Sequence, residues 1–150
     1  GLAVRTFGFE LVRVNGDAMA GTLEEGQVVL VQKGVYFHSA PARGDIVQIK
    51  SPDGVIVRRV IALPGESVEI KGGATYVNGE PLEEAYVAVA GEFDMEQVTL
   101  ASGRYFVMSD NRLNMDDSRT FGADNITRNR VAGKVSHILW PLDHFGPAER

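Results

Sequence analysis

The sequence predicts a mainly β fold, in which short antiparallel strands are joined by tight turns and short helical turns. Short runs of apolar and β-branched residues alternate with segments rich in glycine, proline and asparagine, a pattern typical of chains that form many hairpins. No stretch keeps the 3.6-residue apolar periodicity of a long helix. Asn78-Gly79 is in addition the residue pair that tight β-hairpins prefer.

The first half of the chain is expected to form four strands. Residues 6–14 are rich in aromatic and β-branched side chains, which favours a strand. The glycines within 16–26 favour a tight turn and one short helical turn before the next strand. Turn sequences at 41–45 and 51–54 then bound a β-hairpin. The four strands are expected at 6–14, 28–31, 46–50 and 55–63.

The second half continues the same pattern. Pro64-Gly65 ends the fourth strand, because proline cannot donate to a strand ladder and glycine favours a turn. Residues 83–98 are acidic and irregular, so we expect an exposed loop there. Further strands are expected at 68–70, 75–77, 98–100, 104–108 and 131–139.

Size and composition narrow the function classes. A chain of 150 residues that is 44% apolar is expected to form one domain, spanning 1–150. Its 15 basic and 20 acidic residues give a net charge of −5, which argues against nucleic acid as a partner. The absence of cysteine excludes disulfides and thiolate metal sites. His38, His137 and His144 are too scattered for a metal motif, so we expect neither a metal nor a cofactor.

Four sequence boxes occur in order along the chain. The first is Val-Asn-Gly-Asp-Ala-Met-Ala-Gly-Thr-Leu at 14–23, and the second is Arg-Gly-Asp-Ile-Val at 43–47. The third, at 57–66, contains Arg-Arg-Val-Ile-Ala-Leu-Pro-Gly-Glu, and the fourth, at 105–122, contains Ser-Asp-Asn-Arg and Asp-Asp-Ser-Arg. Together with Tyr-Val-Asn-Gly at 76–79, these boxes resemble those of type I signal peptidases, the Ser/Lys proteases of family S26. The resemblance covers roughly 8–146 and implies the antiparallel β fold that signal peptidases share with LexA-like repressors.

The resemblance also shows where this chain departs from a working protease. Ala18 stands where the family has its nucleophilic serine, Arg58 where it has the general-base lysine, and Met115 where a serine holds that lysine. A methyl group cannot attack a carbonyl, and a thioether cannot donate a hydrogen bond. Deprotonating an arginine at pH 7 would cost about 7 to 9 kcal/mol. The three departures together predict a catalytically inactive member of the family.

The remaining box residues are expected to support the fold or bind a ligand. By resemblance, Arg59 should pair with Asp110, and Asp117 should lie near Arg119. Gly16 and the backbone N–H of Ala18 form a candidate oxyanion-like site, since such a site needs no side chain. The resemblance also implies a groove in which an extended peptide adds as a strand, with Arg58 projecting a cation into its centre. The expected groove walls are Val12, Val14, Met19, Leu23, Val29, Ile56 and Val57.

Several alternatives stay open. The preferred reading is a non-catalytic protein that binds an extended peptide or preprotein segment and assists assembly or secretion. By resemblance it would act at the extracytoplasmic face of the cytoplasmic membrane, held by an N-terminal anchor ahead of residue 1. The chain could instead be an active type I signal peptidase whose sequence has been altered here. A self-cleaving repressor and a catalytic acid pair of Asp17 and Asp116 are less favoured. The sequence does not indicate an oligomeric state.

Overall fold

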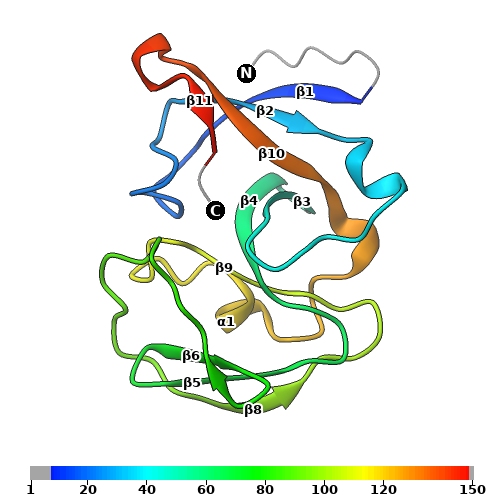
Figure 1. The fold of residues 1–150 in the computed structure, drawn as a ribbon, viewed down its shortest axis with the longest axis vertical. Coiled ribbons are helices and arrows are strands. Elements are labelled where there is room, and N and C mark those ends of the chain that lie inside the picture. Colours follow the sequence, from blue (N-terminus) through cyan, green and yellow to red (C-terminus); the bar gives the residue numbers. More distant parts are fainter. Residues whose placement is uncertain (1–7, 149–150) are drawn as a thin grey trace.

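Two antiparallel β-sheets make up the fold of the computed structural model, which describes residues 8–148 (Figure 1). The larger sheet has the strand order β1-β2-β10-β3-β4-β9, with β11 beside β10. Its strands are β1 (Phe9–Arg13), β2 (Val28–Gln32), β3 (Ile46–Ser51), β4 (Gly54–Ala62), β9 (Phe106–Met108), β10 (Val131–Trp140) and β11 (Gly146–Pro147).

The smaller sheet has the order β7-β6-β5-β8. Its strands are β5 (Ser67–Lys71), β6 (Ala74–Val77), β7 (Glu80–Pro81) and β8 (Met95–Thr99). The helical segments are short, as the sequence predicts. They are η1 (Val35–Phe37), α1 (Ser118–Phe121), η2 (Arg128–Arg130) and η3 (Leu142–His144). No helix within residues 8–148 is both long and apolar enough to cross a bilayer.

The predicted hairpins are confirmed. Ser51 pairs with Gly54, so Pro52 and Asp53 form the two-residue turn between β3 and β4. Asn78, at φ 53°, and Gly79, at φ 79°, join β6 to β7. Positive φ at both central residues is the geometry that makes Asn-Gly favourable in tight hairpins. The mainly β, antiparallel fold class predicted from the sequence is therefore correct.

Two details of the prediction need correction. Strand β8 begins at Met95, inside the segment 83–98 that was expected to be a loop. Its sequence is largely polar and exposed, and it forms because it pairs with β5, where Val98 faces Val68. The strand expected at 6–14 is β1, which ends at Arg13; residues 6 and 7 lie outside the described part.

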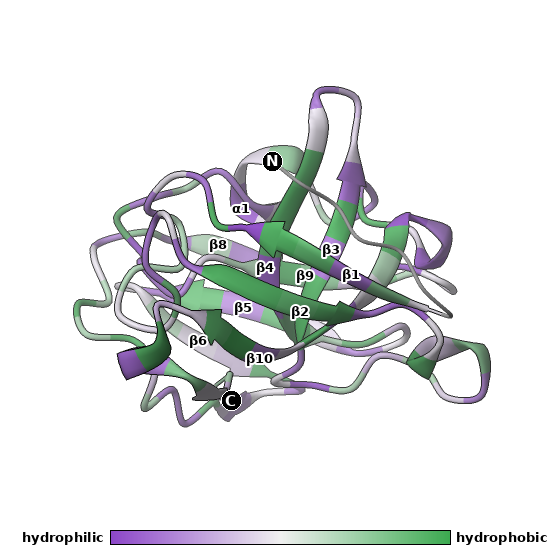
Figure 2. Ribbon diagram, turned by 90° about the horizontal axis from the view of Figure 1, so that it is seen from above, coloured by the Kyte–Doolittle hydropathy of each residue, from purple (hydrophilic) through white to green (hydrophobic). Residues whose placement is uncertain are grey.

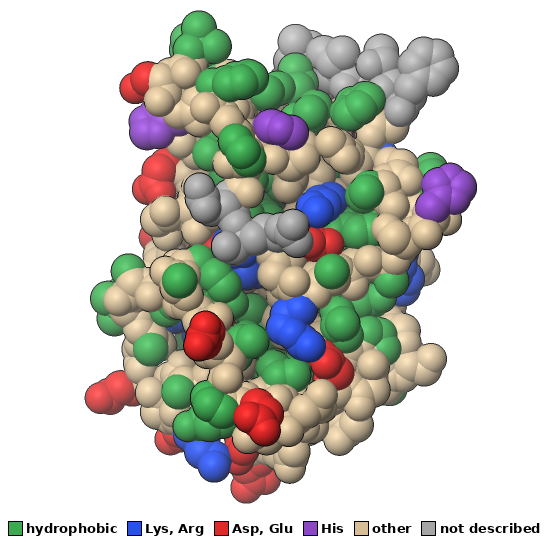
Figure 3. Space-filling view, in the orientation of Figure 1, with side chains coloured by type: hydrophobic (Ala, Val, Ile, Leu, Met, Phe, Trp, Pro, Cys, Tyr) green, Lys and Arg blue, Asp and Glu red, His purple; other side chains and the backbone are tan. Residues whose placement is uncertain are grey.

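The core lies on the inner faces of the sheets, in three clusters of buried side chains. Figure 2 shows that the strands of the larger sheet are hydrophobic over much of their length. The first cluster joins the first sequence box to β2 and β10, through Met19, Leu23, Val29 and Val135. On the outer face drawn in Figure 3, hydrophobic, acidic and basic side chains are mixed, and the described side chains there form no large basic patch.

Candidate functional site

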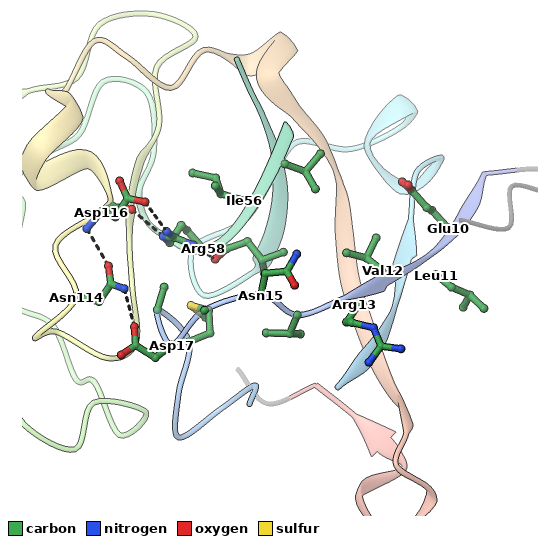
Figure 4. Close-up of a pocket in the computed structure, with 16 residues that line it drawn as sticks. Glu10, Leu11, Val12, Arg13, Asn15, Asp17, Ile56, Arg58, Asn114 and Asp116 are labelled. Carbon is green, nitrogen blue, oxygen red and sulfur yellow. Dashed lines mark hydrogen bonds and ion pairs between the residues drawn. The ribbon is translucent and has the colours of Figure 1, made fainter. Parts of the chain in front are cut away.

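A groove of about 450 Å³ separates β1 from the first half of β4 (Figure 4). Consecutive residues of both strands line the groove. They are residues 10–13 of β1, with Val14 directly after it, and residues 55–58 of β4. Residues 15–19 of the first box close one end together with Asn114 and Asp116. Because neighbouring residues of a strand point to opposite faces, lining by consecutive residues means that the groove exposes the strand edges themselves.

Both edges lack a partner strand at this place. Within the described part, β1 pairs only with β2. β4 pairs along its length with β3, but its pairing with β9 covers only Arg59 to Ala62. Residues 54–58 of β4 therefore face the groove with an unpaired edge. Unpaired strand edges are templates for another extended chain.

The first box is a compact turn that places Ala18 at the end of the groove. Both Thr22 and Leu23 donate their backbone N–H to the carbonyl oxygen of Met19, at 2.9 and 2.7 Å, which confirms the predicted helical turn. Ala18 is only 6% exposed, and its carbonyl accepts from the Asn111 N–H at 3.0 Å. Its methyl group is thus held in place at the end of the groove.

Of the two groups predicted to form an oxyanion-like site, the one at Gly16 is already hydrogen-bonded. The Gly16 N–H donates to the Glu25 carboxylate at 2.8 Å, so it cannot also stabilise an anion in the groove. Glu25 can make this contact because the box folds back on itself, with the Gly26 N–H bonded to the Val14 carbonyl at 2.8 Å. This expectation was therefore wrong for Gly16, and only the Ala18 N–H remains of the proposed site.

Arg58 does not project a free cation into the groove, contrary to the prediction. Its side chain is 7% exposed. Its guanidinium donates to the Val57 carbonyl at 2.7 Å, to the Asp116 carbonyl at 2.9 Å and to the Asp116 carboxylate at 3.3 Å. Burial lowers the pKa of Arg58 below its ordinary value, and the nearby Asp116 and Asp117 oppose this shift. The three acceptors around the guanidinium all favour its charged form.

Asn114 separates the two carboxylates that were considered as a catalytic acid pair. Its Nδ2 donates to Asp17 Oδ1 at 2.8 Å, and its Oδ1 accepts from the Asp116 N–H at 3.0 Å (Figure 4). Among the described residues, no hydrogen bond joins the two carboxylates directly. The arrangement does not match a pair that shares one proton, which requires the carboxylates to touch. Sequence reasoning missed Asn114, although it directly precedes Met115 in the fourth box.

Met115 itself does not line the groove. Its carbonyl oxygen accepts hydrogen bonds from the Asp117 N–H and the Thr120 hydroxyl. The segment after Met115 then starts α1, where the Asp117 side chain accepts from the Arg119 N–H as an N-cap. Met115 therefore acts in this fold through its backbone carbonyl.

Both predicted ion pairs are present, and none of their residues lines the groove. Arg59 donates twice to Asp110, at 2.8 and 2.6 Å, and both side chains are fully buried. The Thr22 hydroxyl donates to the same carboxylate at 2.6 Å, which ties the first box to the third and fourth. Arg119 pairs with Asp117 at 2.8 Å, again with almost no exposure. These contacts fix the boxes relative to one another.

The apolar walls follow the prediction in part. Five of the seven expected residues line the groove: Val12, Val14, Met19, Ile56 and Val57. Leu23 and Val29 do not, because both are fully buried in the first core cluster, and the prediction was wrong for them. Val29 lies on β2, whose position between β1 and β10 places it a strand away from the groove. No group of three or more potential ligands for a metal occurs within residues 8–148.

The chain is similar to known proteins in both sequence and fold. The family model described as signal peptidase, peptidase S26, matches residues 1–140. Signal peptidase I of Bacillus amyloliquefaciens is 37% identical over 94% of this chain and 79% of the relative. Signal peptidase I T of Bacillus subtilis is 36% identical over 96% of this chain and 80% of the relative. The crystal structure of a signal peptidase I from Enterococcus faecalis is similar with a TM-score of 0.55 and 35% identity, over 64% of this chain and 97% of that one.

Proposed function

The chain belongs to the signal peptidase family, peptidase S26, and from this premise we propose that it is a member that binds extended peptides without hydrolysing them. The observation that carries the proposal is the pair of residues at the end of the groove. Ala18 offers a methyl group, and Arg58 is held in three hydrogen bonds as a cation. Neither residue can supply or activate a nucleophile.

The energetic cost of using Arg58 as a general base can be compared with what such a base contributes. General acid–base catalysis contributes roughly 10²- to 10⁴-fold to a rate, which corresponds to about 3 to 5 kcal/mol. Deprotonating an arginine of ordinary pKa at neutral pH costs about 7 to 9 kcal/mol, which is more than this contribution. Burial lowers the pKa of Arg58, and the charges of Asp116 and Asp117 oppose that shift. The Thr22 hydroxyl donates to Asp110, and the Ser118 hydroxyl accepts from the Val107 N–H. Neither lines the groove.

The binding half of the proposal rests on the two unpaired strand edges. A peptide laid between β1 and the first half of β4 can bond to both edges and so bridge the gap in the larger sheet. Main-chain hydrogen bonds then supply affinity, and the apolar walls select side chains. Val12, Ile56 and Val57 provide surfaces suited to small apolar residues.

Family membership also guides the proposed setting. The domain would lie at the extracytoplasmic face of the cytoplasmic membrane, held there by an N-terminal anchor. Its partner would be a preprotein segment in extended form. In this setting it would act as an accessory to secretion or assembly, since it captures a segment and does not cut it.

The test is chemical-shift mapping with isotope-labelled protein and an unlabelled peptide that contains Ala-x-Ala. We expect shift changes at the backbone amides of residues 10–14 and 54–58, and no cleaved peptide by mass spectrometry. Asn15→Trp should block the groove, since Asn15 is exposed and lines it. Glu96→Trp, on the exposed β8 of the smaller sheet, is the matched control and should leave binding unchanged. Shifts confined to other surfaces would overturn the proposal.

A further inference from the structure

The closed end of the groove presents carboxylates, although an arginine lies beside them. The Asp116 side chain is 65% exposed, whereas that of Arg58 is 7% exposed. Asp17 is exposed too and lines the same end. The Arg58 guanidinium donates its hydrogen bonds to the Val57 carbonyl and to Asp116. An incoming chain therefore meets the two carboxylates before it meets the guanidinium.

Each of the two carboxylates is held by a hydrogen bond to one of its oxygens, which leaves the other oxygen able to accept. Asn114 bonds to Asp17 through Oδ1 only, and Arg58 bonds to Asp116 through Oδ2 only. Within residues 8–148, no hydrogen bond reaches Asp17 Oδ2 or Asp116 Oδ1. Figure 4 shows Asp17, Asn114 and Asp116 in a row beside Arg58, at the end of the groove opposite Glu10. Each carboxylate therefore keeps one oxygen that can accept a hydrogen bond from a bound chain.

The other charges of the groove lie elsewhere. Glu10 is paired with Lys33 at 3.0 Å, at the far end of β1. The Arg13 guanidinium bonds to the Gly26 carbonyl at 3.3 Å, on the side away from Asn114 in Figure 4. Asp116 also lines a second pocket, of about 690 Å³, next to the turn between β3 and β4. Asp116 and Ile56 thus line both pockets.

We infer that the groove selects extended peptides that carry a lysine or arginine beside Ala18, and that Asp17 and Asp116 are the residues that recognise it. This inference rests on the proposed function and adds the class of ligand. A cationic side chain offers several N–H donors and a charge of the right sign. A small apolar side chain offers no donor to the second oxygen of either carboxylate, and an acidic side chain is repelled by both.

The test is a positional scan with fluorescent decapeptides made of alanine and serine. One position at a time is changed to lysine, to norleucine or to glutamate, and binding is measured by anisotropy at low salt. We expect lysine to bind roughly three- to tenfold more tightly than norleucine at one or two adjacent positions, and glutamate to bind more weakly. The preference should shrink as salt is raised, because exposed charge pairs are screened.

Asp17→Asn and Asp116→Asn should each reduce the lysine preference, and the double variant should abolish it while norleucine peptides still bind. Asp143→Asn is the matched control, since this exposed carboxylate lines neither pocket. Circular dichroism confirms that the variants fold. If peptides bind but lysine has no advantage, or the advantage survives in the double variant, this inference is wrong and the proposed function stands. If no peptide of any series binds, the proposed function fails as well.

Discussion

Arg58 is bonded twice to Asp116, from Nε to its carbonyl oxygen at 2.9 Å and from a terminal nitrogen to its carboxylate at 3.3 Å. The pair joins β4 to the loop that precedes α1 and lies at the end of the groove. A lysine at this position would have one nitrogen and could not make both contacts together with the bond to the Val57 carbonyl in the same geometry. The acceptors that this loop offers therefore suit an arginine better than a lysine.

Restoring only the nucleophile should not restore hydrolysis. In Ala18→Ser the new hydroxyl has no base, because Arg58 stays protonated. The triple variant Ala18→Ser, Arg58→Lys, Met115→Ser should cleave a preprotein at least about 100-fold faster than the single variant, in line with the usual contribution of a general base. Cleavage rates are measured with a fluorogenic peptide. Strong activity of Ala18→Ser alone would show that another group acts as the base.

The buried pair of Arg59 and Asp110 should contribute far more to stability than an exposed ion pair does. Asp110→Ala leaves the fully buried Arg59 cation without its main counter-charge, which we expect to cost about 3 to 5 kcal/mol of unfolding free energy. Lys71→Gln is the control, because Lys71 is 63% exposed and lies 3.7 Å from Glu69. It should change stability by less than about 0.5 kcal/mol. Urea denaturation measures both, and equal effects would contradict this view of the pair.

Tyr86 should hold the loop before β8 over this ion pair. Its ring centroid lies 3.9 Å from the Arg59 guanidinium carbon, and the neighbouring Glu84 is paired with Arg112. Tyr86→Leu should lower the free energy of unfolding by about 1 to 2 kcal/mol, since it removes a desolvated cation–π contact. Tyr86→Phe keeps the ring and should cost clearly less. Hydrogen exchange of amides 82–94 should rise only in the leucine variant; equal exchange in both would argue against the contact.

Stability should fall at alkaline pH because of two tyrosines. Burial, and next the hydrogen bond to Asp45, raise the pKa of Tyr36; burial, and next the charge of Glu84, raise that of Tyr86. Above about pH 10 the unfolded chain loses these phenolic protons and the folded chain keeps them, so folding becomes less favourable. Each group contributes a slope of at most about 1.4 kcal/mol per pH unit.

The control for this prediction is the double variant Tyr36→Phe, Tyr86→Phe. It should show a flatter dependence of unfolding free energy on pH between about 10 and 12, where the unfolded tyrosines ionise. Both proteins are compared by denaturant titration at each pH. An identical dependence in the two proteins would mean that other groups cause the alkaline loss.

Local patterns were enough to predict most of the fold. The turns at Pro52-Asp53 and Asn78-Gly79 form because of the backbone preferences of their own residues. They can therefore be predicted from the sequence. Strand β8 could not be placed in this way, since its polar residues become a strand only through pairing with β5. The same holds for Gly146 and Pro147, which form β11 because β10 lies beside them.

The site was predictable where the sequence boxes carry the information. The pairs Arg59–Asp110 and Asp117–Arg119 follow from box positions. The direction of the Arg58 side chain does not, because it depends on Asp116, which is 58 residues away in the chain. Leu23 and Val29 show the same limit for apolar residues, since a core position and a groove position have the same chemistry and only the sheet order separates them.

The most direct measurement uses the unmodified protein, a preprotein substrate and intact-mass spectrometry after prolonged incubation at high enzyme concentration. A methyl group at position 18 and a bound guanidinium at position 58 predict that the preprotein keeps its full mass, while an active signal peptidase in the same buffer removes the signal peptide. Cleavage at the usual junction by unmodified protein, with contaminating protease excluded, would contradict the proposed loss of catalysis.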